Sequence, residues 1–382
     1  MIKVGRYTSA LLLVMVGLML FIDQTRGTNL LHYLAIWWPL LLISLGIEYF
    51  LLNGHQQKTG KQMKLAVGSL IFAIIISMLT FGITQLSAYL PNSIWQNIRS
   101  AVPFLSYNAQ TFEGAVQKFS IPADTEKITF ENTNGGIVLQ SGAVDQIEIA
   151  PTTEVDIKNQ DDAKKIADAS TIKMSKEGNH LIFTAQGKSY TISQFTRATK
   201  MNLVARMDLV VTLPESLFVS IDAHTQNGSI TADHVKINNF TAQSMNGSIT
   251  ISGASGTVDV KTLNGSLYLK NNLGDIKAET TNGSITVIEA AKNLQASTIN
   301  GAVHVDSDTV QGEWNTSATT GSINIRLPVV GDYTVEGKGM HASTDIPGLD
   351  ASGRSISGTI GEGSHHISAH SVIGSISFNK VQ

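Results

Sequence analysis

Residues 276–287, with the sequence Ile-Lys-Ala-Glu-Thr-Thr-Asn-Gly-Ser-Ile-Thr-Val, contain the pattern that decides the fold of most of this chain. The pattern is centred on Asn-Gly-Ser followed by an aliphatic residue, and it recurs about every 18 residues. A regular period in this range is typical of stacked supersecondary units. The corner positions of the repeat, including two at which another residue replaces Asn, are Asn134, Asn227, Asn246, Asn264, Asn282, Asn300, Gly321 and Gly374.

Apolar residues alternate on both sides of each corner. Before Asn282 come Ile276 and Ala278, and after it come Ile285 and Val287, each pair spaced by two residues. A period of two is strand periodicity, so alternate side chains point to the same face. The same spacing continues from about residue 125 almost to the C-terminus, which predicts an all-β repeat domain with two short strands per unit.

Two architectures share this alternation. Asn-Gly between alternating strands is a strong hairpin signal, so an antiparallel meander is one interpretation. A meander of this length would leave the apolar face of a very large sheet uncovered. A β-solenoid instead folds the two strands of each unit over a shared core, with equivalent residues stacked about 4.8 Å apart. We therefore expect a β-solenoid, in which the corner Asn side chains form a ladder of amides.

Two segments interrupt the repeat. In residues 141–220 the sequence predicts a short helix at 161–168 and a strand at 207–214 that ends at a proline. Residues 331–363 are rich in Gly, Ser and Asp. Irregular coils near the end of a solenoid are the expected caps, because the last open edge must be covered.

The N-terminal part follows different rules, because it contains long apolar runs of about the 20 residues that a bilayer core requires. We expect a membrane domain over residues 1–89, a stalk over 90–124 and the solenoid over 125–382. The predicted transmembrane α-helices span about 4–22, 30–52 and 65–86.

Charge predicts the orientation of these helices. The segment before the first helix and the loop between the second and third are rich in Lys and Arg, whereas the first loop is weakly charged. Cytoplasmic segments carry the excess of basic residues. The N-terminus is therefore expected in the cytoplasm and the repeat domain outside it. The basic residues that decide this are Lys3, Arg6, Lys58, Lys61 and Lys64.

Composition excludes some functions. The net charge is −3 and no basic stripe is present, which argues against a nucleic-acid partner. The chain contains no cysteine, so disulfides and thiolate metal sites are not possible. The expected partners are instead the lipid bilayer and an envelope glycan or membrane protein.

The membrane region resembles a known family. Trp37-Trp38-Pro39 is followed by Leu-Leu-Leu-Ile and then by Gly46, which is similar to the LiaI/LiaF-like transmembrane region of bacterial cell-envelope stress proteins. The resemblance covers roughly residues 1–55, and it implies a multi-pass protein of the bacterial membrane. We do not find the C-terminal domain of LiaF itself, so control of a sensor kinase does not follow directly.

The repeat region resembles a second family. Val-Thr-Leu-Pro at 211–214, leading into Gln-Asn-Gly-Ser-Ile at 226–230, is similar to the adhesin-like family of bacterial β-strand-repeat domains, whose biochemical role is unassigned. This resemblance covers residues 125–380. It implies the architecture rather than an activity.

Candidate chemistry is weak throughout the chain. The Asn-Gly-Ser corners match the glycosylation pattern, but a structural origin explains them better. His365, His366 and His370 have an odd spacing for a metal site, and no metal or cofactor is predicted. Glu48 suits a snorkelling or inter-helix role. No outward position carries an acid in consecutive coils, so no catalytic residue is predicted: Asp259, Lys277 and Gln295 share one such position.

These observations favour a non-enzymatic, membrane-anchored protein of the bacterial cell envelope. It would present an extracytoplasmic β-solenoid for adhesion, scaffolding or stress sensing. A LiaF-like modulator of a membrane sensor kinase and a polysaccharide-active β-helix enzyme are the two alternatives.

Overall fold

The computed structural model describes residues 2–4, 14, 63–65, 109–193 and 200–381. The chain divides into two compact units. One contains residues 1–107 and 189–203, and the other contains residues 108–188 and 204–382.

Little of the first unit is described. Strand β1 (Ile2–Val4) pairs in parallel with β2 (Met63–Leu65), and β10 (Ser189–Ser193) pairs with β11 (Lys200–Val204). Val14 is helical, whereas Val4 and Leu65, at the starts of two expected helices, lie in strands. Nearly all of the three expected spans lies outside the described residues. Within the described residues, no helix has the length and hydropathy of a membrane span.

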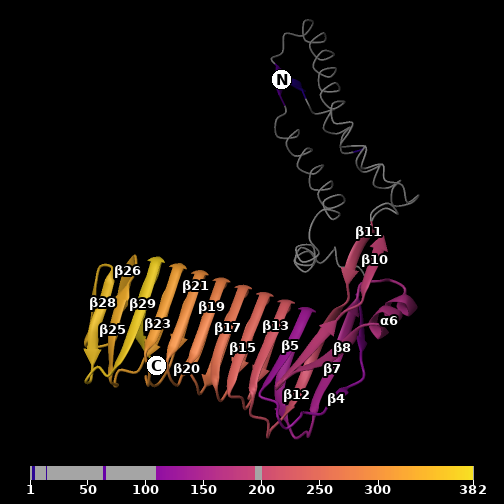
Figure 1. Ribbon diagram of the computed structural model, residues 1–382. Helices are drawn as coiled ribbons and strands as arrows, with labels where there is room; N and C mark the ends of the chain where they lie inside the picture. Colours follow the sequence, from indigo (N-terminus) through magenta and orange to yellow (C-terminus); the bar gives the residue numbers. More distant parts are fainter. Residues whose placement is uncertain (1, 5–13, 15–62, 66–108, 194–199, 382) are drawn as a thin grey trace. The chain divides into compact units, whose positions relative to one another are not determined.

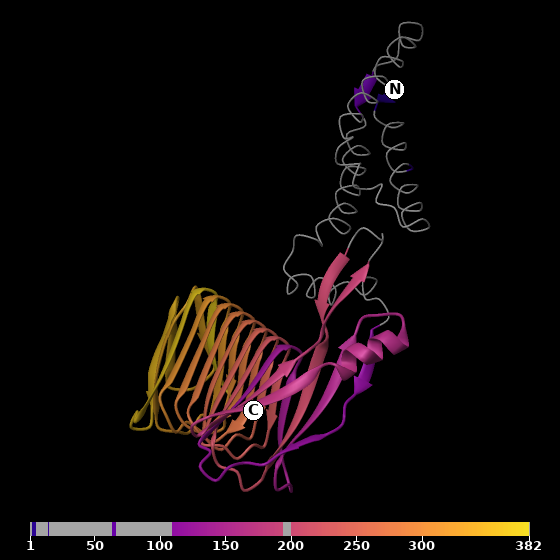
Figure 2. The same ribbon diagram turned by 45° about the vertical axis from the view of Figure 1, so that its right-hand side comes forward.

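The second unit is a β-solenoid in which two sheets of 13 strands share one core (Figures 1 and 2). Sheet I contains the strands that end at the Asn corners. Its order is β27 (Leu349–Ser352), β28 (Ser355–Ile360), β25 (Tyr333–Lys338), β29 (His365–Ile373), β23 (Trp314–Thr320), β21 (Leu294–Asn300), β19 (Ile276–Asn282), β17 (Thr257–Asn264), β15 (Asn239–Asn246), β13 (Ser220–Asn227), β5 (Lys127–Asn134), β9 (His180–Gln186) and β8 (Thr171–Glu177).

Sheet II contains the strands that begin after the corners. Its order is β26 (His341–Thr344), β30 (Ser375–Lys380), β24 (Ile323–Leu327), β22 (Val303–Asp306), β20 (Ile285–Ala290), β18 (Leu267–Asn272), β16 (Ile249–Ser252), β14 (Ile230–Asp233), β6 (Ile137–Gly142), β12 (Arg206–Pro214), β7 (Ile147–Val155) and β3 (Gln110–Glu113), and β4 (Gln117–Phe119) also pairs with β7.

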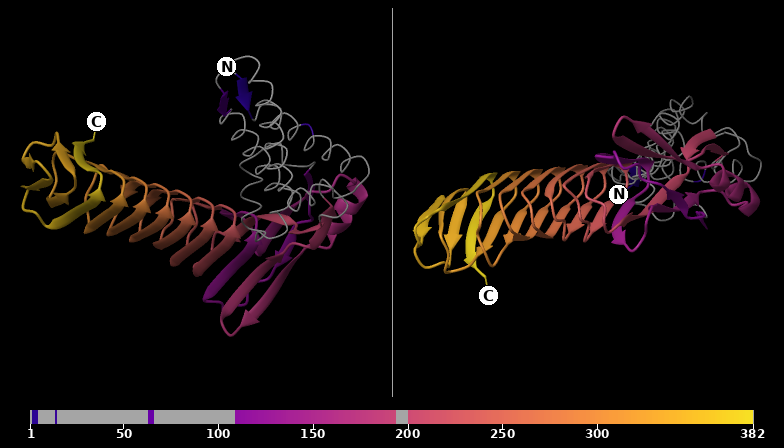
Figure 3. Two further views of the ribbon diagram at one scale, coloured as in Figure 1. Left: turned by 90° about the horizontal axis from the view of Figure 1, so that it is seen from above. Right: turned by 60° about the horizontal axis from the view of Figure 1, so that its bottom comes forward.

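The strand pairing confirms a solenoid and excludes the meander. Successive sheet I strands are parallel and in register, so that Asn264 lies opposite Asn246 on one side and Asn282 on the other. Sheet II repeats this arrangement, with Leu267 opposite Ile285. Figure 3 shows the resulting stack of coils.

The inward residues predicted from the alternation form the core. Ile285 and Val287 are fully buried, whereas Thr286 between them is partly exposed. Small residues such as Ala278 and Ala296 face this row across the thin interior. The burial therefore follows the period-two pattern along both strands of each coil.

The first interruption of the repeat extends the sheets. The predicted helix is α6 (Gln160–Asp168), which Asn159 caps by accepting hydrogen bonds from the first-turn amides. The predicted strand at 207–214 is β12, which pairs in parallel with β6. Gln110–Glu113 and Gln117–Phe119, which the sequence predicted to lie in the stalk, form β3 and β4, and both strands pair with β7.

The C-terminal end departs from chain order. After β24 the chain forms β25 to β28 and then returns, so that β29 and β30 lie between the earlier coil and β25 and β26. The coil at Gly374 is therefore an inner coil, whereas its position in the sequence places it last. Residues 331–363 form the end of the array, as expected for a cap.

Candidate binding groove

The corner asparagines form a ladder of side-chain amides. Each Nδ2 donates to the Oδ1 of the previous coil at 2.8–3.0 Å, in the pairs Asn246 to Asn227, Asn264 to Asn246, Asn282 to Asn264 and Asn300 to Asn282. Asn134 lies in the same register, but its Nδ2 donates to the Val204 carbonyl at 3.1 Å. The ladder accounts for the glycosylation-like pattern, because these amides are used between coils.

The glycine after each Asn is required by the neighbouring coil. A Cβ on Gly265 would lie 2.1 Å from the carbonyl oxygen of Gly247, and one on Gly374 would lie 2.0 Å from that of Gly321. On Gly321 it would lie 1.8 Å from the carbonyl oxygen of Gly301. Only glycine lets the coils stack this closely. The Asn-Gly pair therefore marks close stacking here rather than a hairpin.

The hydroxyl two residues before each corner is a further structural group. Thr262, Thr280 and Thr298 are buried, and each donates to the glycine carbonyl of the previous coil at 2.9 Å. The sequence shows a hydroxyl or small residue at this position of each repeat but not the partner of the hydroxyl. Their hydrogen bonds satisfy a carbonyl that the corner would otherwise leave unpaired.

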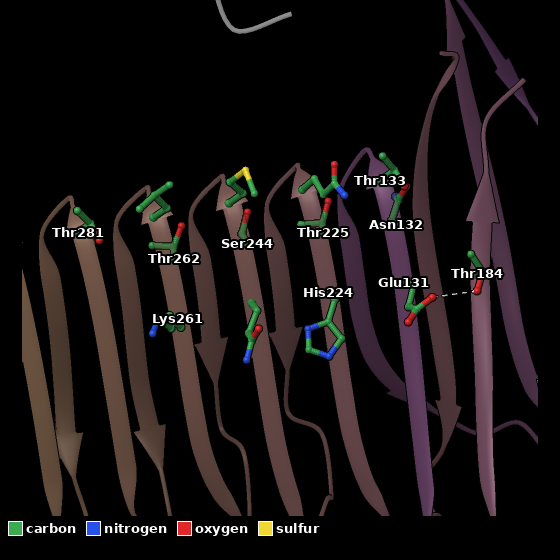
Figure 4. Close-up of a pocket in the computed structure, with 14 residues that line it drawn as sticks. Glu131, Asn132, Thr133, Thr184, His224, Thr225, Ser244, Lys261, Thr262 and Thr281 are labelled. Atoms are coloured by element: carbon green, nitrogen blue, oxygen red, sulfur yellow. Dashed lines mark hydrogen bonds between the residues drawn. The ribbon is translucent and has the colours of Figure 1, made fainter. Parts of the chain in front are cut away.

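A groove of about 570 Å³ lies on the outer face of sheet I (Figure 4). Glu131, His224, Gln243 and Lys261 face outward from β5, β13, β15 and β17, where they are direct register neighbours. They form the groove row, in which carboxylate, imidazole, amide and ammonium groups follow one another at about 4.8 Å intervals. The row therefore offers donors and acceptors in sequence along one line.

The two borders of the groove differ in character. Near the Asn corners it is bordered by Met245 and Leu263, which are 48% and 45% exposed. At the β9 end, Thr184 donates from Oγ1 to Glu131 at 3.1 Å. An apolar border beside a polar row is typical of sites that position a ligand by a few polar contacts.

Ion pairs surround the groove row. Lys127 Nζ lies 2.6 Å from Asp222, and His224 Nε2 lies 3.8 Å from the same carboxylate. Partial burial raises the pKa of Asp222, but His224 and Lys127 lower it by more, so it lies below its ordinary value.

A second set of ion pairs follows at the other end of the row. Lys277 and Lys261 contact Glu279 at 3.1 and 3.3 Å. The hydrogen bond from Lys277 lowers the pKa of Glu279, slight burial opposes it, and Lys261 lowers it further. Both carboxylates are therefore held in their charged form.

The other residues singled out in the sequence do not join this groove. His365, His366 and His370 all lie on β29, and no cluster of metal-ligating side chains occurs among the described residues. The membrane motif Trp37, Trp38, Pro39 and Gly46 lies outside the described residues, as does Glu48. The groove itself was not predicted, although each member of the groove row lies three residues before a corner Asn. Only Thr184 of β9, at one end of the groove, comes from the irregular insertion.

Fold and site together define a parallel β-solenoid with a polar groove beside an amide ladder. Residues 125–379 match the Toastrack DUF4097 family, and the chain belongs to this family. Residues 8–91 match the LiaF transmembrane domain. The matches confirm both resemblances found in the sequence and support a membrane-anchored protein.

A search of solved structures finds similarities at low identity and low TM-score. A candidate cell adhesion protein from Clostridium sporogenes is 13% identical, with a TM-score of 0.26, and the match covers 71% of this chain and 100% of that chain. A candidate adhesin from Bacteroides fragilis is 11% identical, with a TM-score of 0.33, and the match covers 72% and 97%. A comparison with curated proteins finds no significant match.

Proposed function

We propose that this protein is a binding scaffold of the bacterial cell envelope. Its solenoid would bind an extended polymer outside the membrane, with an envelope glycan as the first class to test. The observation that carries the proposal is the groove row, in which four different polar groups follow one line at the coil spacing. A ligand with polar groups repeated about every 5 Å can contact successive coils.

The structure of the coil supports this role. The Asn ladder and the buried hydroxyls hold the corner end of the sheet I strands in place. A preorganised surface loses little conformational entropy on binding, so modest individual contacts add up to affinity. Adhesion, scaffolding and stress sensing all require such a surface.

The extracytoplasmic position is part of the proposal. It rests on the basic residues Lys58, Lys61 and Lys64 between the second and third expected helices. In this orientation residues from about 90 onward lie outside the cytoplasmic membrane.

Carboxylate chemistry at this face argues for binding rather than hydrolysis. A glycosidase needs an acid with a raised pKa beside a second carboxylate. Glu279 instead has a lowered pKa because of Lys277. Asp259 contacts the same Lys277 at 3.9 Å, so a cation rather than a shared proton lies between these two carboxylates.

A photocrosslinking experiment tests the proposal in intact cells. Because the chain has no cysteine, a benzophenone can be attached at Gln243→Cys alone in the groove. Tyr268→Cys, on the outer face of sheet II, is the matched control. We expect several-fold more adduct from position 243, and less when Lys261→Ala is added. Equal yields from both faces would contradict the proposal.

A LiaF-like modulator is the second candidate function, and the match of residues 8–91 favours it. Here the membrane domain would bind a sensor kinase, and the solenoid would report on the envelope. The same experiment separates the two roles. Recovery of a membrane kinase from a benzophenone at Lys61→Cys, in the loop between the second and third expected helices, would favour the modulator, whereas glycan adducts at position 243 favour the scaffold.

A further inference from the structure

Along the repeat coils, one long edge of the solenoid is formed by segments without a charged residue. Only its first coil contacts charged side chains among the described residues, because Asp208, paired with Arg206, accepts a hydrogen bond from the Gly136 amide. The uncharged ridge consists of each Asn corner with the residue before it and the three residues that complete the corner after it. No Asp, Glu, Lys, Arg or His occurs in its segments, which are 133–137, 226–230, 245–249, 263–267, 281–285, 299–303, 319–323 and 372–376.

Exposed apolar side chains stand on this ridge. Met245, Leu263 and Ile299 are 45–49% exposed, and Val372 and Ile373 are each 56% exposed. Met340 continues the line, because its backbone amide donates to the Gly374 carbonyl and its side chain is 45% exposed. Between them lie the corner amides and hydroxyls. Apolar groups set among uncharged polar groups suit the interface of a bilayer.

The opposite edge has the contrary character. Its turns join sheet II strands to the following sheet I strands. Exposed carboxylates recur along them at Glu215, Asp233, Asp275, Asp308 and Glu313, and they outnumber the exposed Lys236 and Lys292 in the same turns. Phe218, Leu273 and Val330 are exposed there too, but they lie among these acids. A carboxylate loses hydration at a lipid surface and is repelled by anionic lipids. The two edges therefore differ in their suitability for a membrane.

The covalent link to the membrane domain allows even a weak contact to hold the solenoid at the bilayer surface. The match to the LiaF transmembrane domain ends at residue 91, and β3 begins at Gln110. The residues between them reach at most roughly 60 Å, so the solenoid cannot leave the neighbourhood of the bilayer. Tethering converts binding to the surface into an intramolecular step with a high effective concentration.

We propose that the uncharged ridge rests against the surface of the lipid bilayer to which this chain is anchored. Met245, Leu263, Ile299 and Val372 enter the headgroup region, and the corner amides and hydroxyls bond to lipid oxygens. The acidic edge then faces away from the membrane. The contact requires the membrane domain, and it does not depend on a ligand in the groove.

Fluorescence of the full chain in phosphatidylcholine liposomes tests this contact. Single variants Ile299→Cys and Val372→Cys, which lie outside the groove, carry an environment-sensitive probe. Leu273→Cys, on the acidic edge and 60% exposed, is the matched control. We expect lipids with nitroxide headgroups to quench the two ridge probes several-fold more than the control. Aqueous iodide should show the reverse order.

Other results would overturn the proposal. Equal lipid quenching at positions 299, 372 and 273 would show that the bilayer contacts the ridge no more than it contacts the opposite edge. Ridge probes that are shielded from iodide but not quenched by nitroxide lipid would assign the ridge to a second copy of the chain or another protein. Ile299→Asp should also lower the quenching of a probe at Met340→Cys, whereas Gln295→Asp should leave it unchanged. An unliganded groove alters none of these outcomes.

Discussion

Gly265 shows how a single residue type controls the stacking of the coils. The alanine variant Gly265→Ala places a methyl group 2.1 Å from the Gly247 carbonyl oxygen if nothing moves. Backbone atoms cannot rotate away, so the coils must separate. We expect a loss of about 3 kcal/mol or more in unfolding free energy, measured by urea denaturation.

The neighbouring serine provides the control for this prediction. Ser266 is exposed, and its Oγ accepts only a 3.3 Å hydrogen bond from the Ser284 amide. Ser266→Ala should cost no more than about 1 kcal/mol. Similar losses from both variants would show that the corner does not need glycine.

At this scale the sequence predicts some roles and hides others. The repeated Asn gives the amide ladder directly, because identical side chains at one register position must meet in a solenoid. The buried hydroxyl of Thr280 is not predictable in this way. Its acceptor, the Gly265 carbonyl, belongs to the previous coil, and a small residue at this position has a packing explanation as well.

Ion pairs on the outer face connect neighbouring strands, and the pair between β5 and β13 is the shortest of those on sheet I among the described residues. Lys127 on β5 lies 2.6 Å from Asp222 on β13, and the pKa of Asp222 is lowered in the folded protein. Because its pKa is lowered on folding, the charged carboxylate stabilises the folded protein at pH values above its pKa in the unfolded chain, near 3.8. This stabilisation is lost as the pH falls through the folded value.

The pH dependence gives a prediction for this pair of strands. Wild type should be more stable than Asp222→Asn at neutral pH, and the difference should shrink below about pH 4. Urea denaturation at several pH values measures it. Asp259→Asn, at the corresponding position of β17, is the control, because its contact with Lys277 is longer, at 3.9 Å. A difference that stays constant down to pH 2 would rule out this linkage.

Among the elements, regular coils were predictable and the order at the ends was not. Alternation around Asn282 gives both strands and their buried faces. The position of β29 between β23 and β25 depends on a return of the chain after a segment of more than forty residues. No local pattern encodes such a return. One end of the groove shares this difficulty, since Thr184 contacts Glu131 from an insertion that lacks the repeat.

The whole molecule combines a Toastrack DUF4097 domain with a LiaF transmembrane domain. The sequence predicted this division. Apolar runs of about 20 residues indicate membrane helices, whereas apolar residues at every second position indicate strands. The proposed ridge and groove give the solenoid one edge for the bilayer and one face for a ligand. Both roles require that the solenoid and its ligand lie on the same side of the membrane.

The side of the membrane on which the solenoid lies is therefore the most direct thing to measure. An impermeant thiol reagent is applied to intact cells that carry Gln295→Cys, on the exposed outer face of sheet I, or Lys61→Cys, in the predicted cytoplasmic loop. We expect Gln295→Cys to be labelled in intact cells and Lys61→Cys to be labelled only after permeabilisation. Labelling of Lys61→Cys with protection of Gln295→Cys would place the solenoid in the cytoplasm and contradict the account.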